Sequence, residues 1–318
     1  MASLITGVGG FAGQHLAAYL LGRGEAVFGG ARRGLRWHVP TVPAAPGFTL
    51  LSADLTSSVE TRRAVQMANP DRIYHLAAQS SVADSLADPL GTIHNNSAAL
   101  VHLLEAVREV APKAKVLVVS SAEVYGRSAG GPIDETAELR PESPYAVSKA
   151  AVDLLGYQYY VSYGLPIVRV RPFNHIGPGQ SDRFVASSFA RQIAEIERGV
   201  REPFLDVGNL DAQRDFTDVR DMVRAYELAL TLGEPGSVYN LGCSTPITVR
   251  AILDHLLALS RKPATVRVDL QRLRRADAPL QVCDGRRFRA LTQWEPSIPL
   301  DVTLSDLLDY WRAQVASR

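Results

Sequence analysis

Residues 4–13 combine a short apolar run, three glycines and the start of a helical pattern. Gly7, Gly10 and Gly13 are spaced three apart, directly after Leu4-Ile5-Thr6. This order predicts a strand, a tight turn and a helix. Gly7 can adopt backbone angles that a side chain forbids, Gly10 lets the backbone approach a pyrophosphate, and Gly13 lets the helix lie close to the sheet. The free N–H groups at the start of the helix would then face phosphates.

Strand-like and helix-like segments alternate through the first half of the chain. Such alternation predicts parallel strands joined by right-handed crossovers, and therefore an α/β fold with a doubly wound parallel sheet of the Rossmann type. A ligand is then expected at the carboxyl ends of the strands. The expected strands are 4–6, 26–29, 48–51, 73–77, 115–120 and 167–171, and the expected helices are 13–21, 59–67, 92–107 and 145–160.

The pattern loosens after residue 171. We predict a dinucleotide-binding domain over residues 1–172 and a smaller α/β substrate-binding lobe over residues 173–318. Segments within 214–242, such as the strand 238–241, are expected to return to the first sheet. Further helices are expected at 184–198 and 219–232, and the segments 247–259, 266–270 and 304–315 complete this part of the chain.

Composition excludes several classes of protein. The net charge of +1 gives no field that would favour nucleic acid or an anionic membrane. No apolar stretch reaches membrane-spanning length, and no export sequence is expected before the glycine triplet. Cys243 and Cys283 lie far apart without metal-ligand spacing. We therefore expect a cytoplasmic protein with no metal, no nucleic-acid partner and no membrane partner.

Tyr145 and Lys149 would lie one turn apart on the same face of a helix that starts at Ser143-Pro144. Ser121 follows an expected strand and would reach the carboxyl edge of the sheet. When a carbonyl is reduced, its oxygen gains negative charge and must receive a proton. Tyrosine can supply that proton, and we expect the Lys149 ammonium to lower the tyrosine pKa. Ser121 can hydrogen-bond the same oxygen.

With these residues the chain resembles the short-chain dehydrogenase/reductase superfamily, in its extended, nucleotide-sugar-modifying branch. The resemblance implies catalytic roles for Ser121, Tyr145 and Lys149, with Lys149 also holding the nicotinamide ribose. It further implies that Phe11 belongs to the cofactor turn, that Asp54 and Leu55 contact adenine, that Ala77 and Ala78 line the cofactor groove, and that Asn96 helps to position the active site. The motifs that carry it are Gly7-x-x-Gly10-x-x-Gly13, Asp54-Leu55, His75-Leu76-Ala77-Ala78, Ser121-Ala122-Glu123-Val124-Tyr125-Gly126, Ser143-Pro144-Tyr145-x-x-x-Lys149 and Arg171-Pro172-Phe173-Asn174.

The end of the second expected strand indicates which cofactor is preferred. Folds that prefer NAD place an acid there, on the ribose hydroxyls. Here the strand is followed by Arg32 and Arg33. Two guanidinium groups suit a 2′-phosphate, so we expect NADP(H), with NAD(H) left open.

The second half of the chain resembles the GDP-6-deoxy-4-keto-mannose reductases, which give GDP-D-rhamnose and are close to the GDP-mannose 4,6-dehydratases. The segments that carry this resemblance are 173–180, 207–210, 214–219 and 273–277. Arg214 and Arg274 are candidates to clamp the diphosphate of such a substrate through charge-assisted hydrogen bonds. Asn174 could donate to a phosphate oxygen, Asp277 could accept from ribose hydroxyls, and Val207, Gly208 and Asn209 could flank the base.

Glu123 leaves a second reaction open. In the dehydratases a glutamate at this position removes the C5 proton, whereas in a reductase Glu123 would be a polar contact to the sugar. The neighbouring Ala122 can transfer no proton, so half of a dehydratase pair is present. A dehydratase or epimerase that uses Glu123 as a base therefore stays open. A non-catalytic NADP-binding sensor is the alternative from another class.

The expected helices at 92–107 and 145–160 carry apolar residues on more than one face. In relatives, the equivalent helices pair in a dimeric four-helix bundle. The resemblance therefore implies a homodimer.

Overall fold

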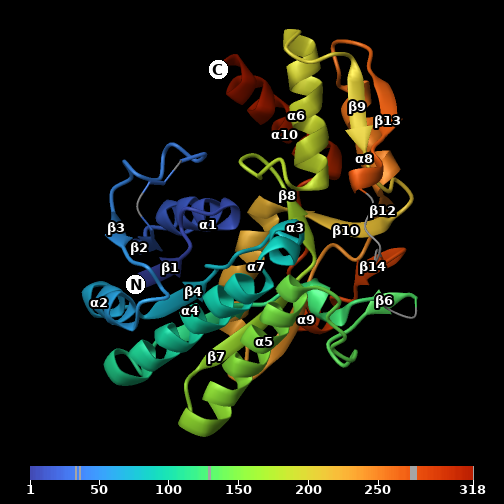
Figure 1. Cartoon of the computed structure of the whole chain (residues 1–318). Coiled ribbons are helices and arrows are strands. Elements are labelled where there is room, and N and C mark those ends of the chain that lie inside the picture. Colours follow the sequence, from blue (N-terminus) through green and yellow to red (C-terminus); the bar gives the residue numbers. More distant parts are fainter. Residues whose placement is uncertain (33, 36, 128–129, 273–277, 318) are drawn as a thin grey trace.

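A parallel sheet of seven strands forms the centre of the larger lobe (Figure 1). The computed structural model describes residues 1–317 except 33, 36, 128–129 and 273–277. The strand order is β3-β2-β1-β4-β5-β7-β11, and every neighbouring pair is parallel. The predicted doubly wound α/β fold is thus confirmed. The strands are β1 (Ala2–Thr6), β2 (Ala26–Ala31), β3 (Phe48–Ser52), β4 (Arg72–His75), β5 (Lys115–Val119), β7 (Ile167–Pro172) and β11 (Val238–Leu241).

Helices cover both faces of this sheet, which explains why its strands are apolar in consecutive positions. In β1, for example, Leu4 packs into the core under α2, α4 and α5, whereas Ile5 packs into the core under α1 and α7. The first layer is α2 (Ser58–Ala68), α4 (Pro89–Val110) and α5 (Pro144–Tyr163), and the second is α1 (Phe11–Gly22), α7 (Val219–Leu232) and α9 (Arg286–Thr292).

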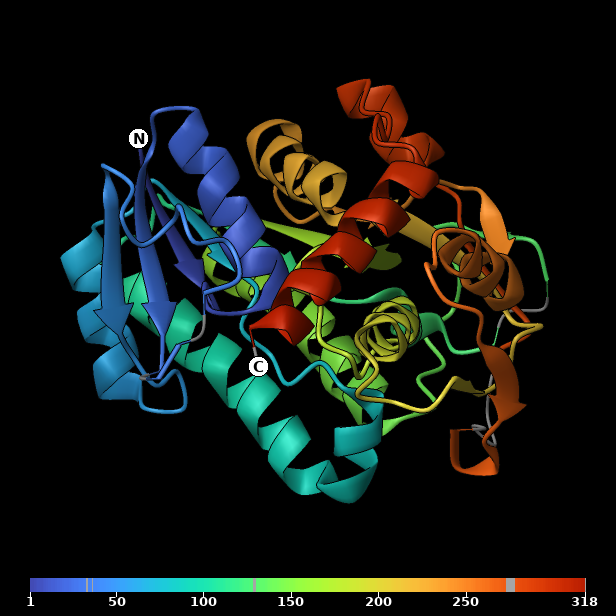
Figure 2. The ribbon, with the colours of Figure 1, turned by 90° about the horizontal axis from the view of Figure 1, so that it is seen from above.

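A smaller lobe lies at the far side of the molecule from β3 and α2, as Figures 1 and 2 show. Its core joins the apolar faces of three helices to a two-stranded parallel sheet. The helices are α6 (Val185–Arg198), α8 (Val249–Ala258) and α10 (Leu300–Ala316), and the strands are β9 (Phe204–Val207) and β13 (Thr265–Val268), followed by the 3₁₀ turn η2 (Leu270–Arg272).

A second sheet joins the two lobes. It has the order β12-β10-β14-β6, with β8 paired to β10. The sequence did not predict the strands of this sheet, because four of them have four residues or fewer and β10 is rich in charged residues. The strands are β6 (Pro132–Ile133), β8 (Asn174–Ile176), β10 (Gln213–Asp218), β12 (Pro246–Thr248) and β14 (Leu280–Cys283).

The chain crosses between the lobes more than once. As expected, β11 returns to the large sheet, where it pairs with β7. In addition, β6 from the first half pairs with β14, and Phe288 of α9 packs into the core of the larger lobe. A division at residue 172 stays a prediction.

Candidate active site

The glycine-rich turn between β1 and α1 has the predicted close approaches. Gly7 has a φ of 75°, and a Cβ there would lie 2.8 Å from the Ala77 backbone. A Cβ on Gly13 would lie 2.3 Å from the Gly7 carbonyl oxygen. Helix α1 starts after Gly10 with no side-chain cap and no acidic residue in its first turn. Its first N–H groups therefore suit an anion, as a dinucleotide pyrophosphate requires.

Phe11 links this turn to the loop that follows β7. Its ring is stacked on that of His175, with centroids 5.9 Å apart and planes 5° apart. His15 forms a 2.8 Å hydrogen bond with the Pro178 carbonyl oxygen in the same loop. The cofactor turn and the entrance to the smaller lobe are therefore packed against each other.

Arg32 and Asp54 come together where β2 and β3 end. Two hydrogen bonds from Thr56 lower the pKa of Asp54, and the Arg32 charge lowers it further. The Arg32 side chain is exposed, and Leu55 is half-buried beside Asp54. An exposed guanidinium at this strand end fits the 2′-phosphate of NADP(H). Its predicted companion Arg33 lies outside the described residues.

Tyr145 and Lys149 lie in the first two turns of α5, where Ser143 caps the helix and Pro144 takes its first position. Ser121 caps the 3₁₀ turn η1 (Ala122–Tyr125), directly after β5. The Ser121 hydroxyl lies close enough to Tyr145 to favour ionisation of its phenol. The exposed fractions of Ser121 and Tyr145 are 8% and 9%, so water barely reaches either hydroxyl.

The pKa of Tyr145 shifts in the direction opposite to the one expected. Burial raises it to about 12, the nearby Ser121 hydroxyl opposes that rise, and the Glu123 charge adds to it. Lys149 is not among the groups that shift this pKa, so the expectation that Lys149 lowers it is wrong for this structure, where the cost of desolvating the phenolate decides the direction. At neutral pH the tyrosine keeps its proton, which is the state that a proton donor needs.

Lys149 is held on the backbone of β5. Its ammonium donates a 2.7 Å hydrogen bond to the Val119 carbonyl oxygen. Burial lowers its pKa to about 8. Burial, together with the charge of Lys149, lowers the pKa of His75 to about 3, so His75 is neutral. His75 shares a 2.9 Å hydrogen bond with Thr6.

Asn96 fixes the floor of this site from α4. Its side-chain oxygen accepts from Gln79 N at 2.8 Å, and its amide nitrogen donates to Gln79 O at 3.1 Å and to Ser148 Oγ at 2.8 Å. Ser148 in turn donates to the Tyr145 carbonyl oxygen. Asn96 therefore joins the segment after Ala77 and Ala78 to the start of α5, which agrees with a positioning role.

A buried polar network behind the site escaped the sequence analysis. Asp153 of α5 is fully buried and accepts from Arg169 and Arg171 of β7. Arg171 also donates to the hydroxyl of Tyr125 at the end of η1, and that hydroxyl donates to Asn240 of β11. The Arg171-Pro172-Phe173-Asn174 motif was visible, but the partners of Arg171 lie far away in the sequence.

Residues predicted to hold the substrate lie on the smaller lobe and at the junction. The Asn174 side-chain nitrogen is buried and finds no hydrogen-bond partner among the described residues, so it is available to a ligand. Arg214 is half-buried on β10 and donates to the Ala278 carbonyl oxygen at 2.6 Å. Arg274 and Asp277 lie outside the described residues.

The side chain of Val207 does not lie where a residue that flanks a base would lie. Its side chain is fully buried in the core of the smaller lobe, because β9 turns it toward α6 and α8. Asn209, two residues on, is half-buried and accepts from Asp211 N at 3.0 Å. Asn209 and the backbone of Gly208 therefore remain as candidates.

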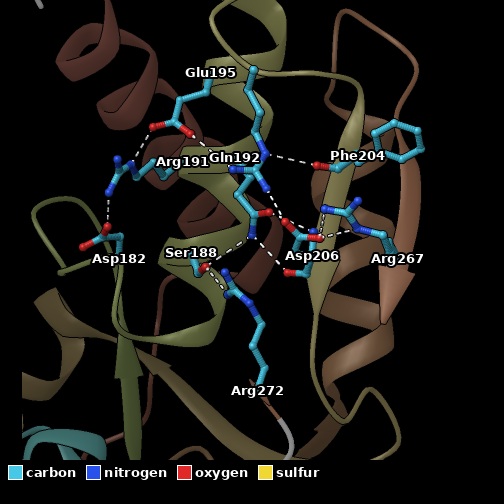
Figure 3. A network of polar contacts seen from close by, with 10 residues as sticks. Asp182, Ser188, Arg191, Gln192, Glu195, Phe204, Asp206, Arg267 and Arg272 are labelled. Atoms are coloured by element: carbon cyan, nitrogen blue, oxygen red, sulfur yellow. Dashed lines mark hydrogen bonds and ion pairs between the residues drawn. The ribbon is translucent and has the colours of Figure 1, made fainter. Parts of the chain in front are cut away.

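An ionic network braces this part of the lobe (Figure 3). Asp206 accepts from Arg201 and from Arg267, and these bonds hold its pKa below the usual range, with Arg267 the main cause. Gln192 of α6 bonds both the N–H and the carbonyl of Asp206. Arg272 donates to Ser188 of α6. The strand that precedes Gly208 is thereby fixed to α6.

The described residues contain no cluster of histidine, cysteine and acidic side chains that could hold a metal. None of their helices is both long and apolar enough to span a membrane. A cavity of about 370 Å³ lies between Phe216, Cys243 and Pro299, away from Tyr145 and Ser121.

The fold and the paired Ser121, Tyr145 and Lys149 define an enzyme of the short-chain dehydrogenase/reductase class, with a nicotinamide dinucleotide as cofactor. Residues 4–307 match the family model described as GDP-mannose 4,6 dehydratase, and the chain belongs to that family. GDP-6-deoxy-D-mannose reductase from Pseudomonas aeruginosa is 34% identical, over 98% of this chain and 97% of the relative.

A GDP-mannose 4,6-dehydratase from Vibrio cholerae is 35% identical over 73% of this chain and 65% of the relative. Among solved structures, RMD from Pseudomonas aeruginosa complexed with NADPH has a TM-score of 0.85 and 32% identity, and the match covers 99% of this chain and 100% of that one. The reductase and the RMD–NADPH structure each match over nearly the full length of both chains, whereas this dehydratase matches over part.

Proposed function

We propose that this protein is an NADPH-dependent reductase that converts the 4-keto group of a GDP-linked 6-deoxy-4-keto-hexose to a hydroxyl, giving GDP-D-rhamnose. The observation that carries the proposal is the buried Tyr145 hydroxyl, close to Ser121 in a site where position 122 is alanine. Such a site can donate a proton to a ketone oxygen, but Ala122 cannot assist a leaving hydroxyl. The full-length similarity to a reductase supports the same choice.

The cofactor is held, in this proposal, by the glycine-rich turn, Arg32 and Asp54, with Ala77 and Ala78 along the groove and Lys149 at the ribose. Bound NADPH supplies the hydride. Ser121 hydrogen-bonds the ketone oxygen and stabilises its developing charge, and Tyr145 delivers the proton to that oxygen. Asn174 and Arg214 anchor the diphosphate, so the sugar is held in register with these groups.

An assay that follows NADPH absorbance in the presence of a GDP-linked 4-keto-6-deoxyhexose tests the proposal. A reductase consumes NADPH in a one-to-one ratio with the ketone. No consumption by a protein that still binds NADPH would contradict it. A non-catalytic sensor would then also form no product from GDP-mannose, whereas a dehydratase would.

Glu123 supports a second candidate, a GDP-mannose 4,6-dehydratase or an epimerase. Its charge is close enough to Tyr145 to raise the tyrosine pKa, so a carboxylate lies near the site. With GDP-mannose as substrate, a dehydratase regenerates its cofactor at each turnover. Steady absorbance together with formation of a 4-keto product would therefore favour this candidate.

We further propose that the protein is a homodimer in the cytoplasm. The outer face of α5 exposes Val147, Leu154 and Val161, which are seven residues apart and thus lie on one stripe of the helix. Both cysteines are free thiols, which agrees with a reducing compartment.

A further inference from the structure

The 3₁₀ turn η1, which follows Ser121 and carries Glu123, is held by groups from distant parts of the chain. The Ala122 carbonyl accepts from Gln281 Nε2 at 3.1 Å, and the Val124 carbonyl accepts from Arg140 N at 2.9 Å. Tyr125 is bonded by Arg171, as described above. The position of Ser121 relative to Tyr145 therefore depends on contacts that η1 does not make by itself.

Gln281 differs from the other groups because it comes from the sheet that carries the substrate-binding residues. It lies on β14, its exposed fraction is 4%, and it is 159 residues from Ala122. A buried amide that loses its partner costs more than an exposed one, because water cannot replace the bond. The hydrogen bond to Ala122 is therefore a firm link between β14 and the catalytic turn.

Strand β14 is parallel to β10, and Gln281 is the register partner of Arg214. Partners in register lie on the same face of a sheet, so these two side chains are neighbours. The fully buried Asp215 carboxylate locks the two strands together, since it accepts from Cys283 N of β14 at 3.1 Å. It also accepts from Cys243 N and Ser244 N, at 2.9 and 2.8 Å.

We propose that Gln281 is a positioning residue that couples the diphosphate site at Arg214 to the catalytic turn, so that a bound nucleotide diphosphate fixes Ser121 against Tyr145. This inference rests on the proposed function, because it takes Arg214 as a diphosphate ligand. In this way, binding of the diphosphate orients Ser121 at the reacting carbonyl. The binding energy therefore raises kcat and does not lower KM.

The first test is the variant Gln281→Met, which keeps the length of the side chain and removes the hydrogen-bond donor. We expect kcat to fall about 10- to 100-fold, as for a small misplacement of catalytic groups, with KM for the sugar nucleotide and Kd for NADPH unchanged. In a Ser121→Ala background the same substitution should cause no further loss, because the effect acts through Ser121. Losses that multiply in the double variant would overturn the proposal.

Gln192→Met is the matched control. Gln192 has the same exposed fraction of 4%, and its Nε2 donates to the Asp206 carbonyl oxygen at 3.2 Å, within the brace of Figure 3. It should lower the melting temperature as Gln281→Met does and leave kcat unchanged. An equal fall of kcat in both variants would reduce the role of Gln281 to general stability and would overturn the proposal.

Hydrogen exchange provides a readout that needs no turnover. GDP should slow exchange of the amides of residues 122–125 in the wild type, and it should bind Gln281→Met equally well without slowing them. Equal slowing in both proteins would overturn the coupling alone. A wild type that neither binds GDP nor consumes NADPH would contradict the proposed function, and the coupling with it.

Discussion

Tyr145 shows how burial decides the chemistry of a single residue. Its hydroxyl lies next to Ser121 in a place that water barely reaches, so its pKa rises to about 12. A group with such a pKa donates a proton readily only while the accepting oxygen gains charge. Hydride addition to a carbonyl produces that charge.

The variant Tyr145→Phe removes this donor. We expect kcat to fall by about 10²- to 10⁴-fold, the usual contribution of a positioned acid, while Kd for NADPH stays unchanged. The measurement is steady-state NADPH oxidation combined with a fluorescence titration of NADPH. Tyr159→Phe is the control, since it removes a second buried hydroxyl from α5, one that donates to Glu105 instead of facing the site. Turnover of Tyr145→Phe at the rate of the control would contradict the assignment.

Lys149 makes the reaction sensitive to pH on the alkaline side. Its pKa is lowered to about 8, so it is charged below pH 8 and neutral above it. If the ammonium holds the ribose, kcat/KM should fall as the pH rises through about 8. The unfolded chain keeps this proton up to about pH 10.4, so between these values it binds more protons than the folded chain, and the contribution of Lys149 to stability increases with pH.

Activity and stability should thus change in opposite directions between pH 8 and 10 as far as Lys149 is concerned. Parallel measurements of kcat/KM and of urea unfolding, on the wild type and on Lys149→Met, separate the two effects. A wild-type rate that stays flat through pH 9.5 would exclude a role for the charged form.

At the scale of elements, α5 is attached to the sheet by a buried charge network as well as by apolar packing. Asp153 accepts hydrogen bonds from Arg169 and Arg171 at 2.7 to 3.1 Å. Burial lowers the pKa of Arg169, and Asp153 opposes that effect. These hydrogen bonds therefore fix α5 to β7, two turns after Tyr145.

Asp153→Asn should destabilise the protein strongly, because it leaves two buried guanidinium groups without a counter-charge. Breaking a buried pair in this way costs about 3–5 kcal/mol. Asp309→Asn breaks the pair with Arg312 at a side chain that is 63% exposed, and should cost about 0–1 kcal/mol. Urea unfolding of both variants tests the difference, and a loss for Asp153→Asn no greater than that of the control would contradict it.

At the scale of the whole molecule, α5, which packs against α4, exposes several apolar side chains. Leu154, Tyr157 and Val161 are 57%, 48% and 61% exposed, in a chain whose other helices mostly bury such residues. Burying this stripe against a second copy would remove it from water, which is the main favourable contribution to association.

We expect light scattering at micromolar concentration to give twice the chain mass of 34.5 kDa. The double variant Leu154→Asp, Val161→Asp should give a single chain mass, because two charges would lie in the centre of the interface. Lys113→Asp changes an exposed charge elsewhere and should leave the dimer intact. A wild type of single mass would reject the dimer.

The sequence by itself determined the features that depend on neighbouring residues. The strand, turn and helix at residues 4–13, the alternation of strands and helices, and the one-turn spacing of Tyr145 and Lys149 are all set by local backbone rules. For the same reason the long, strongly patterned elements were predicted with the correct type. The strands of the second sheet and α3 (Val82–Ala87), which are short or rich in charged residues, were not.

Only the tertiary structure decided the partners of the polar side chains. The hydrogen bond that holds Lys149 to the Val119 carbonyl joins residues 30 positions apart, and the link from Gln281 to Ala122 joins residues 159 positions apart. The burial that raises the pKa of Tyr145 likewise comes from packing in space. The core placement of Val207 was settled in the same way, by which face of β9 meets α6. Hydrogen bonds and desolvation depend on distance in space, and the spacing of residues along a chain does not specify that distance.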